Sequence, residues 1–506
     1  MSKAEQQPSN LLIGGANQQQ ILMDASMANR HGMIAGATGT GKTITMQILA
    51  EEFSKIGVPV LMADVKGDVS GLARAATPHP KIDERIEKIA ITDYQMQANP
   101  VVFWDLYGKL GHPVRATVGE LGPLMLSNLL DLNETQTGVL YTAFKIADEN
   151  GFMLYDLEDL QSLLAWMADN SKELRGEYGN FTSSSIGSIQ RGLLVIEEQD
   201  AEVFVGEPVL DLADMMRQDF SGRGIINLLD VTTIISRGPK MYATFLMWLM
   251  SELFENMPEA GDSDKPKFVM FFDEAHLLFD DAPKALVNKI EQVVRLIRSK
   301  GVGVYFVSQS PMDIPEDILG QLGLKIQHAL RAFTPKERKA VSIVAENFRQ
   351  NPEIDTKTVI TELGIGEALV SVLDANGAPT PVERVLIRPP QSRIGPITTE
   401  ERQEQIKRSP IGTKYDVTLN RESAKEILKA RAEEKIKRAE ELERQKAEAE
   451  AAEKEAKKEE RASRKSSSRR SDSATEALVK SLARSMGTQL GGRIIRGVLG
   501  SLLGGR

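Results

Sequence analysis

The chain has 506 residues, of which 41% are apolar and none is cysteine, so it can bury a large core but cannot form a disulfide framework or a thiolate metal site. Its formal net charge of −9 is uneven, because residues 421–506 hold 22 Lys and Arg against 15 Asp and Glu, net +7, which leaves −16 for residues 1–420. An acidic body argues against an outer surface coated with nucleic acid, although it does not exclude a basic pore lining.

A glycine-rich loop lies between the first strand and the first helix that the sequence predicts. Residues 31–35 read as a short buried strand, and residues 43–56 carry apolar side chains at helical spacing. The residues between them fit the phosphate-binding pattern G-x-x-x-x-G-K-[ST] and are Gly36, Ala37, Thr38, Gly39, Thr40, Gly41, Lys42 and Thr43. In such a loop the backbone N–H groups surround phosphate, Lys42 would reach the β- and γ-phosphates, and the Thr43 hydroxyl would bind Mg²⁺. The alternative is an ordinary glycine-rich surface turn.

The predicted organisation begins with an N-terminal segment, residues 1–22, whose first ten residues are polar and expected to be disordered. Residues 23–103 are expected to form the first part of an ATPase core, with a second strand at residues 58–64. Asp64 and Asp68 would then lie near the ligand edge of the sheet, although acids in loops are commonly only solvated. Residues 104–221 are predicted to be a mostly helical insertion, with helices at residues 119–131, 134–150, 156–170 and 183–198.

The second part of the core, residues 222–400, is predicted to begin with a strand at residues 222–230. Residues 268–272 form an apolar run that suits a strand buried on both faces of a parallel sheet. Asp273 and Glu274 follow it, at the carboxyl edge where ligands bind in such sheets. Asp273 would hold the Mg²⁺ shell, and Glu274 would orient and deprotonate the attacking water. A strand that simply ends in solvated acids is the alternative.

Two further candidates flank the next predicted strand, residues 301–307. Gln309 at its tip could sense the γ-phosphate or help to position water. Arg298 lies before the strand in the last turn of a helix, where it could be an arginine finger for a neighbouring subunit or merely a cation that complements the helix dipole. A strand at residues 324–329 and a hairpin of residues 368–373 and 382–387 complete this part.

The carboxyl-terminal part of the chain has a different composition. Residues 401–470 are predicted to form a charged helical or flexible linker, in which residues 423–470 lack a sustained apolar stripe and favour a solvated single helix. Residues 471–506 are apolar and rich in glycine, and they could dock on the body of the protein, pair with a partner, or lie on a membrane surface. We expect docking first.

These motifs together resemble the HerA–FtsK group of motor ATPases, and most of all its bacterial HerA-like members. The similarity covers roughly residues 10–400 and extends to three further stretches: residues 63–68, residues 206–208 and residues 388–396. The resemblance implies a RecA-like α/β core with a mainly parallel sheet between helices, a homo-hexameric ring with ATP and Mg²⁺ at subunit interfaces, and DNA translocation through the pore. By position in the motifs it assigns Lys42, Thr43, Asp273 and Glu274 to the ATP site. It matches Arg298 to the finger acting in trans and Gln309 to the sensor.

The resemblance also sets limits on partners and location. Archaeal members carry an amino-terminal β-barrel that docks a nuclease, and only 35 residues precede Gly36, so we do not expect a nuclease bound in that manner. No signal peptide opens the chain, and the apolar stretch of residues 242–254 is shorter than the roughly 20 residues of a membrane span, so we expect a cytoplasmic protein without transmembrane segments. Three functions remain open: an ATP-driven DNA translocase or helicase-like motor, a nucleotide-gated assembly protein, and a motor for a protein substrate or a membrane-associated machine.

Overall fold

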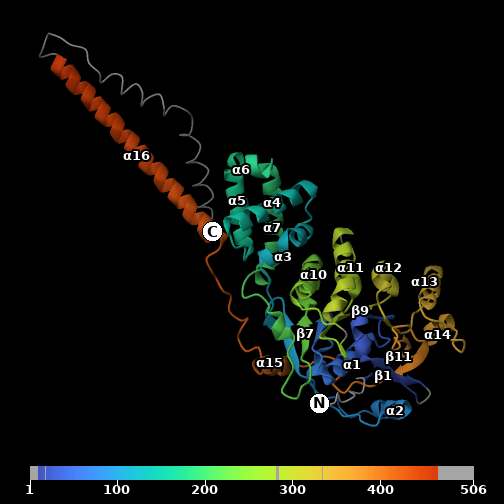
Figure 1. Ribbon diagram of the computed structural model, residues 1–506. Coiled ribbons are helices and arrows are strands. Elements are labelled where there is room, and N and C mark those ends of the chain that lie inside the picture. The colour runs from blue at the N-terminus through green and yellow to red at the C-terminus, as the bar shows by residue number, and fades with distance from the viewer. Residues whose placement is uncertain (1–9, 17–18, 262, 281–283, 333, 465–506) are drawn as a thin grey trace, which may run out of the picture. The chain divides into compact units, whose positions relative to one another are not determined.

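The computed structural model describes residues 10–464 apart from 17–18, 262, 281–283 and 333, and it divides into two units, residues 1–429 and 430–506 (Figure 1). The described part of the first unit contains a 12-stranded sheet. Its strands, in spatial order, are β2 (Gln19–Asp24), β1 (Asn10–Ala16), β12 (Glu383–Ile387), β11 (Glu367–Ser371), β10 (Leu324–Gln327), β3 (Gly32–Ala35), β9 (Val302–Ser308), β8 (Phe268–Phe272), β4 (Val60–Asp64), β7 (Ile226–Asp230), β5 (Val101–Asp105) and β6 (His112–Pro113).

The strands from β10 to β6 all run parallel, whereas β2, β1, β12 and β11 pair antiparallel at the other end of the sheet. In the parallel part Ala35 pairs with Ser308 and Phe272 pairs with Phe306, so β3, β9 and β8 end at the same edge. Only β9 lies between β3 and β8 in the sheet. The glycine loop after β3 and the acids after β8 are therefore close neighbours. The predicted mixed α/β fold with a mainly parallel sheet is confirmed.

Both faces of the parallel strands are buried, which explains why these strands read as continuous apolar runs. Along β8, Val269 and Phe271 belong to one apolar core with α1 (Lys42–Lys55), while Met270 and Phe272 belong to another. The second core includes the inner faces of α10 (Pro239–Asn256) and α11 (Lys284–Ile297). The apolar stretch of residues 242–254 is therefore part of a helix in the core.

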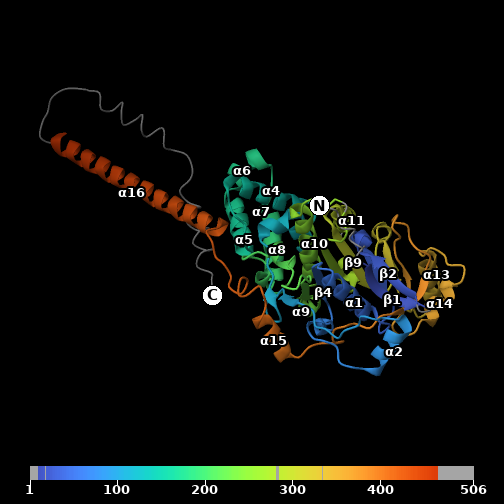
Figure 2. The ribbon, with the colours of Figure 1, turned by 60° about the horizontal axis from the view of Figure 1, so that its bottom comes forward.

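The helical insertion lies beyond the β5 end of the sheet and packs on the second core (Figure 2). It contains α3 (Val118–Leu129), α4 (Glu134–Asn150), α5 (Leu157–Asp169), α6 (Ser171–Tyr178), α7 (Ser183–Glu197) and α8 (Leu212–Met215). Thr117, Asn133 and Asp156 each form a capping box at the start of a helix, so the beginnings of α3, α4 and α5 are fixed by local hydrogen bonds.

Two parts of the sheet differ from what the sequence indicates. The strand β5 crosses the boundary expected between residues 103 and 104, and it extends the sheet beside β7 instead of opening the insertion. The strands β1 and β2 lie within the segment of residues 1–22 and its border, and β1 joins the sheet through β12. Both are short apolar runs, for which periodicity alone does not distinguish strand from helix or loop.

The remaining helices of this unit are short. They are α2 (Pro80–Ile89), α9 (Thr232–Arg237), α12 (Glu316–Leu319), α13 (Pro335–Glu346), α14 (Thr356–Glu362) and α15 (Thr399–Lys407). The helices α13 and α14 share a small apolar cluster of their own with β11. After α15 the chain runs along the insertion, where the Lys425 N–H donates to Asp159 at 3.0 Å.

The tail contains α16 (Ala424–Arg464), which enters the second unit at residue 430. From residue 430 to residue 458 nearly all its side chains are exposed, and pairs one turn apart such as Arg438–Glu434 support it, as the prediction of a solvated helix requires. Residues 1–9 of the expected N-terminal segment, and the whole segment expected at residues 471–506, lie outside the described residues. Within the described residues, no helix combines the length and apolarity that a membrane crossing demands.

Candidate nucleotide site

The glycine loop connects the end of β3 to the start of α1, the order that the motif requires. Gly36, Gly39 and Gly41 have φ values of 150°, 77° and 118°, in a region that side chains disfavour. A Cβ on Gly36 would also lie 2.5 Å from the Cβ of His328. Two backbone hydrogen bonds hold the loop, from Ala37 N–H to the Ala329 carbonyl and from Gly366 N–H to the Thr40 carbonyl, both at 2.9 Å. The loop therefore has a fixed shape over the amino end of a 14-residue helix.

The Lys42 side chain folds back across this loop. Its Nζ donates to the carbonyls of Gly36 at 2.6 Å and Ala37 at 3.2 Å. Burial lowers the pKa of Lys42, and the nearby Lys66 lowers it further, while Glu274 and Asp273 act in the opposite direction. The ammonium group thus lies at the mouth of the loop, between its carbonyls and the acids after β8.

Oxygen donors gather beside Thr43. The Thr43 hydroxyl acts to lower the pKa of the neighbouring Asp68, which burial raises, and the Asp68 Oδ1 is buried without a hydrogen-bond partner. Asp273 is 4% exposed and accepts the Glu274 N–H at 2.9 Å, and its burial raises its pKa to about 6 although Lys66 opposes this. A hydroxyl and carboxylates form the hard oxygen set that Mg²⁺ prefers, and the unsatisfied Asp68 oxygen shows that the set is not complete by itself, so these residues fit that ion.

Glu274 is held at the centre of a polar cluster. Its φ of 47° turns the chain sharply after β8. Lys66 Nζ lies 2.7 Å from Oε1, while Gln309 Nε2 donates to Oε2 at 3.5 Å and His276 Nδ1 lies 3.4 Å from the same oxygen. Burial would raise the pKa of Glu274, but the ion pair with Lys66, together with His276 and Gln309, holds it below its usual value. Glu274 is therefore ionised and able to accept a proton from water.

The structure brings most of the sequence-predicted site residues to one edge of the sheet, and it places Arg298 elsewhere. Arg298 begins a 3₁₀ turn (Arg298–Lys300) between α11 and β9, so it lies at the amino end of the strand whose carboxyl end carries Gln309. Seven strand residues span about 20 Å. The proximity of Arg298 to His31, which precedes β3 and whose pKa it helps to lower, also places it at that opposite edge.

Sequence reasoning did not assign a role to Lys66 and left Asp68 as an acid near the edge. The available signal was the polar stretch after β4, because the carboxyl ends of parallel strands share an edge with the glycine loop. The stretch itself is Asp64, Val65, Lys66, Gly67 and Asp68. Burial raises the pKa of Asp64 to about 7, and repulsion from Asp68 and Asp230 adds to the effect, so Asp64 holds a proton more readily than an ordinary aspartate.

Comparisons with known proteins identify the family to which this sequence is similar. A model of the family described as "Helicase HerA-like C-terminal" matches residues 9–506. The DNA double-strand break repair helicase HerA of Sulfurisphaera tokodaii is 23% identical over 373 residues, which cover 71% of this chain and 65% of the relative. The protein of the same name from Sulfolobus acidocaldarius is 22% identical over 353 residues, covering 68% and 62%. The chain thus spans about 65% of the length of such relatives.

Solved structures show the same fold. The structure of VirB4 of Thermoanaerobacter pseudethanolicus gives a TM-score of 0.50 at 16% identity, over 76% of this chain and 97% of that one. The plasmid coupling protein TrwB in complex with a non-hydrolysable ATP analogue gives 0.51 at 12% identity, over 77% and 91%. At these identities the likeness concerns the fold alone, and it confirms the predicted RecA-like core.

Proposed function

Because this chain belongs to the family of HerA-like helicase C-terminal proteins, we propose that it is an ATP-hydrolysing ring motor that moves DNA. One observation carries the hydrolytic part of this proposal: the phosphate loop, the acids after β8 and the tip of β9 meet at a single edge of the sheet. Glu274 there is buried, ionised and 3.5 Å from Gln309, an arrangement suited to turnover and not only to binding.

Each residue then has a separate task in ATP hydrolysis. The N–H groups of residues 36–43 and the Lys42 ammonium bind the phosphates. Glu274 accepts the proton of the attacking water, and Gln309 orients that water against the γ-phosphate. Thr43 and Asp273 would hold Mg²⁺, with Asp68 beside them, and the bound ion would neutralise charge on the phosphate oxygens. Lys66 keeps Glu274 deprotonated, since its ammonium is 2.7 Å from Oε1.

The DNA part of the proposal is supported by the names of the relatives, which are DNA repair helicases. A homo-hexamer with DNA in its pore would also explain why Arg298 lies too far from its own phosphate loop to act there. A cytoplasmic location remains a prediction. The alternative is a nucleotide-gated assembly protein or a motor for another polymer. The net charge of −16 over residues 1–420 favours this alternative, because an acidic protein is poorly suited to bind DNA over an extensive surface.

The test is the ATPase rate of purified protein with and without duplex DNA, compared with that of Glu274→Gln. We expect DNA to stimulate the wild type. The variant should retain ATP binding and lose hydrolysis, because glutamine keeps the shape of the side chain and cannot accept the proton. Wild-type turnover by Glu274→Gln would show that another group activates water. Hydrolysis that responds to no DNA substrate would favour the alternative function.

A further inference from the structure

The ammonium group of Lys66 occupies one oxygen of the carboxylate to which the proton of the attacking water is assigned. Its Nζ lies 2.7 Å from Glu274 Oε1, the short separation of a charge-assisted hydrogen bond. The contacts to the other oxygen are longer, 3.5 Å from Gln309 Nε2 and 3.4 Å from His276 Nδ1. Lys66 is therefore the closest of these partners, and a water molecule that approaches Oε1 has to displace it.

The two members of this ion pair differ in how firmly the fold holds them. The Glu274 side chain is 9% exposed, and its own backbone N–H donates to Asp273 at 2.9 Å. The Lys66 side chain is 42% exposed and has a flexible four-carbon stem. The backbone that carries it is fixed, because the Gly67 N–H donates to the Asp64 carboxylate at 2.7 Å. The pair can therefore separate by rotation of the Lys66 side chain alone.

Lys66 lies among the charges that a bound nucleotide would change. Burial would lower the pKa of Lys66, but the attraction of Glu274, Asp273 and Asp68 raises it above its usual value. Burial lowers the pKa of Lys42, and the charge of Lys66 lowers it further, so the two ammonium groups lie near each other. A γ-phosphate bound at Lys42 would attract Lys66, and a metal ion at Asp273 would repel it. Both forces act to separate Lys66 from Glu274.

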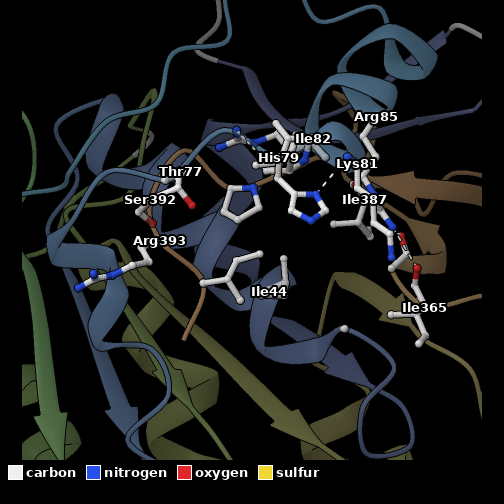
Figure 3. Close-up of a pocket in the computed structure, with 17 residues that line it drawn as sticks. Ile44, Thr77, His79, Lys81, Ile82, Arg85, Ile365, Ile387, Ser392 and Arg393 are labelled. Atoms are coloured by element: carbon white, nitrogen blue, oxygen red, sulfur yellow. Dashed lines mark hydrogen bonds between the residues drawn. The ribbon is translucent and has the colours of Figure 1, made fainter. Parts of the chain in front are cut away.

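Arginines on another side of the loop already have partners of their own. A cavity of about 490 Å³ lies beside Gly41, between the phosphate loop, α2 and the segment that follows β12 (Figure 3). Its lining residues, all of them described, include neither Lys66 nor the acids after β8. Arg85 in its wall donates to three backbone carbonyls at 2.8 to 3.2 Å, and Arg393 pairs with Glu401. These arginines connect segments of the fold, whereas the partner of Lys66 is the proposed base itself.

We propose that Lys66 blocks Glu274 until ATP binds, and that it then moves onto the γ-phosphate and leaves Oε1 open to the attacking water. This assignment rests on the proposed function, since it requires hydrolysis at this site. ADP lacks the γ-phosphate and would leave the ion pair closed. The site would thus expose its base only when the phosphate to be removed is present.

The test measures the affinity of the full-length protein for ADP and for a non-hydrolysable ATP analogue, with Mg²⁺ present. The test variant is Lys66→Met, which removes the charge and keeps an unbranched side chain. The matched control is Lys55→Met, because the Lys55 side chain is 50% exposed and pairs with Asp93 at 3.3 Å. Lys55 ends the same helix that Lys42 begins, roughly 20 Å away.

A transfer of Lys66 in about nine of ten molecules requires that it contribute about tenfold to the affinity for the analogue. We therefore expect Lys66→Met to bind the analogue at least about tenfold more weakly, and ADP within about twofold of the wild type. The control should match the wild type with both nucleotides. An unchanged affinity for the analogue, or an equal loss for both nucleotides, would overturn the proposal, since a lysine that only stabilises the loop does not distinguish them. A wild type that bound neither nucleotide would instead overturn the proposed function itself.

A second measurement does not depend on substitution. An acyl phosphate of ATP carries its acyl group on the γ-phosphate and modifies a lysine that reaches this phosphate. The amine nitrogen forms an amide bond with the acyl carbon, the acyl–phosphate bond breaks, ATP leaves and the amine proton passes to solvent. Mass spectrometry of peptides from the wild type should find the acyl group on Lys66, and an excess of the non-hydrolysable analogue should suppress it. An unmodified Lys66, or modification that the analogue does not suppress, would overturn the proposal.

Discussion

Replacing Arg298 with alanine tests whether the ATP site is completed by a second copy of the chain. Arg298 and the phosphate loop lie at opposite edges of the sheet, separated by the seven residues of β9 or about 20 Å. Across that distance in water, two unit charges interact by about 0.2 kcal/mol before salt screening, and a Debye length of about 8 Å removes most of that. Within its own subunit Arg298 would therefore change the hydrolysis rate less than twofold.

In a neighbouring subunit the same guanidinium could contact the γ-phosphate directly, where arginine fingers contribute roughly 10³ to 10⁵ in rate. Arg298→Ala should then bind ATP normally and hydrolyse it at least about 10³-fold more slowly. The matched control is Arg295→Ala, since Arg295 lies one turn earlier on α11, is also exposed and pairs with Glu291 on its own helix. Steady-state ATPase rates should also rise more steeply than linearly with protein concentration through the assembly range.

Mixing two inactive variants gives the decisive assay. If the chain assembles into rings with Arg298 acting on the neighbouring subunit, rings that contain both Arg298→Ala and Glu274→Gln subunits will have some interfaces at which an intact Glu274 meets an intact Arg298, so partial recovery of hydrolysis is expected. If a mass measurement confirms that mixed oligomers form and hydrolysis still does not recover, Arg298 is only a cation at the end of a helix. The finger would then have to be sought among other arginines, of which Arg331 is exposed.

Two further predictions concern stability. Glu51→Ala should lower the free energy of unfolding by about 3–5 kcal/mol in chemical denaturation, because it removes the buried carboxylate that accepts Gln391 N–H at 2.9 Å and pairs with Arg388 at 3.1 Å. The control, Glu84→Ala on the exposed face of α2, should stay close to the wild type in stability. Equal stability of the two variants would contradict this account. His31 and His328 are buried bases whose pKa is lowered to about 4, mainly by desolvation, so their contribution to stability is complete above pH 6.5 and falls as the pH drops toward 4, by about 2 kcal/mol each at pH 5. The urea midpoint should follow this loss between pH 7 and pH 5, and His328→Gln or His31→Gln should flatten the dependence; an unchanged pH dependence in both variants would refute it.

The parts of the site that the sequence predicts are those encoded within one short stretch. The glycine loop needs only its own residues and the flanking strand and helix, and the acids after β8 follow directly from the apolar run of that strand. Hydrophobic patterning also locates β3 and β9, which are apolar runs, and the longer helices of the insertion, which have apolar residues at helical spacing.

What the sequence does not predict depends on contacts between distant segments. The ion pair of Lys66 with Glu274 joins positions 208 residues apart, and the cavity beside Gly41 needs three segments that meet only in the fold. The strand β5 was missed for a related reason, because a run of four apolar residues is specified as a strand only by its pairing with β7. Local patterns identify the chemistry of this chain, and tertiary contacts determine which polar groups serve it.

The strand β9 connects Arg298, which precedes it, to Gln309, which follows it, so the covalent chain fixes the distance between these two residues. Its backbone is hydrogen-bonded to β3 on one side and β8 on the other, so it cannot stretch or bend easily between Arg298 and Gln309. If Arg298 serves the adjacent subunit, a displacement of Gln309 when the γ-phosphate leaves is transmitted along this strand as a rigid shift. Loss of phosphate at one interface would then move the Arg298 guanidinium toward or away from the next interface. The order in which the sites of a ring hydrolyse ATP would in that case be set by the movement of β9.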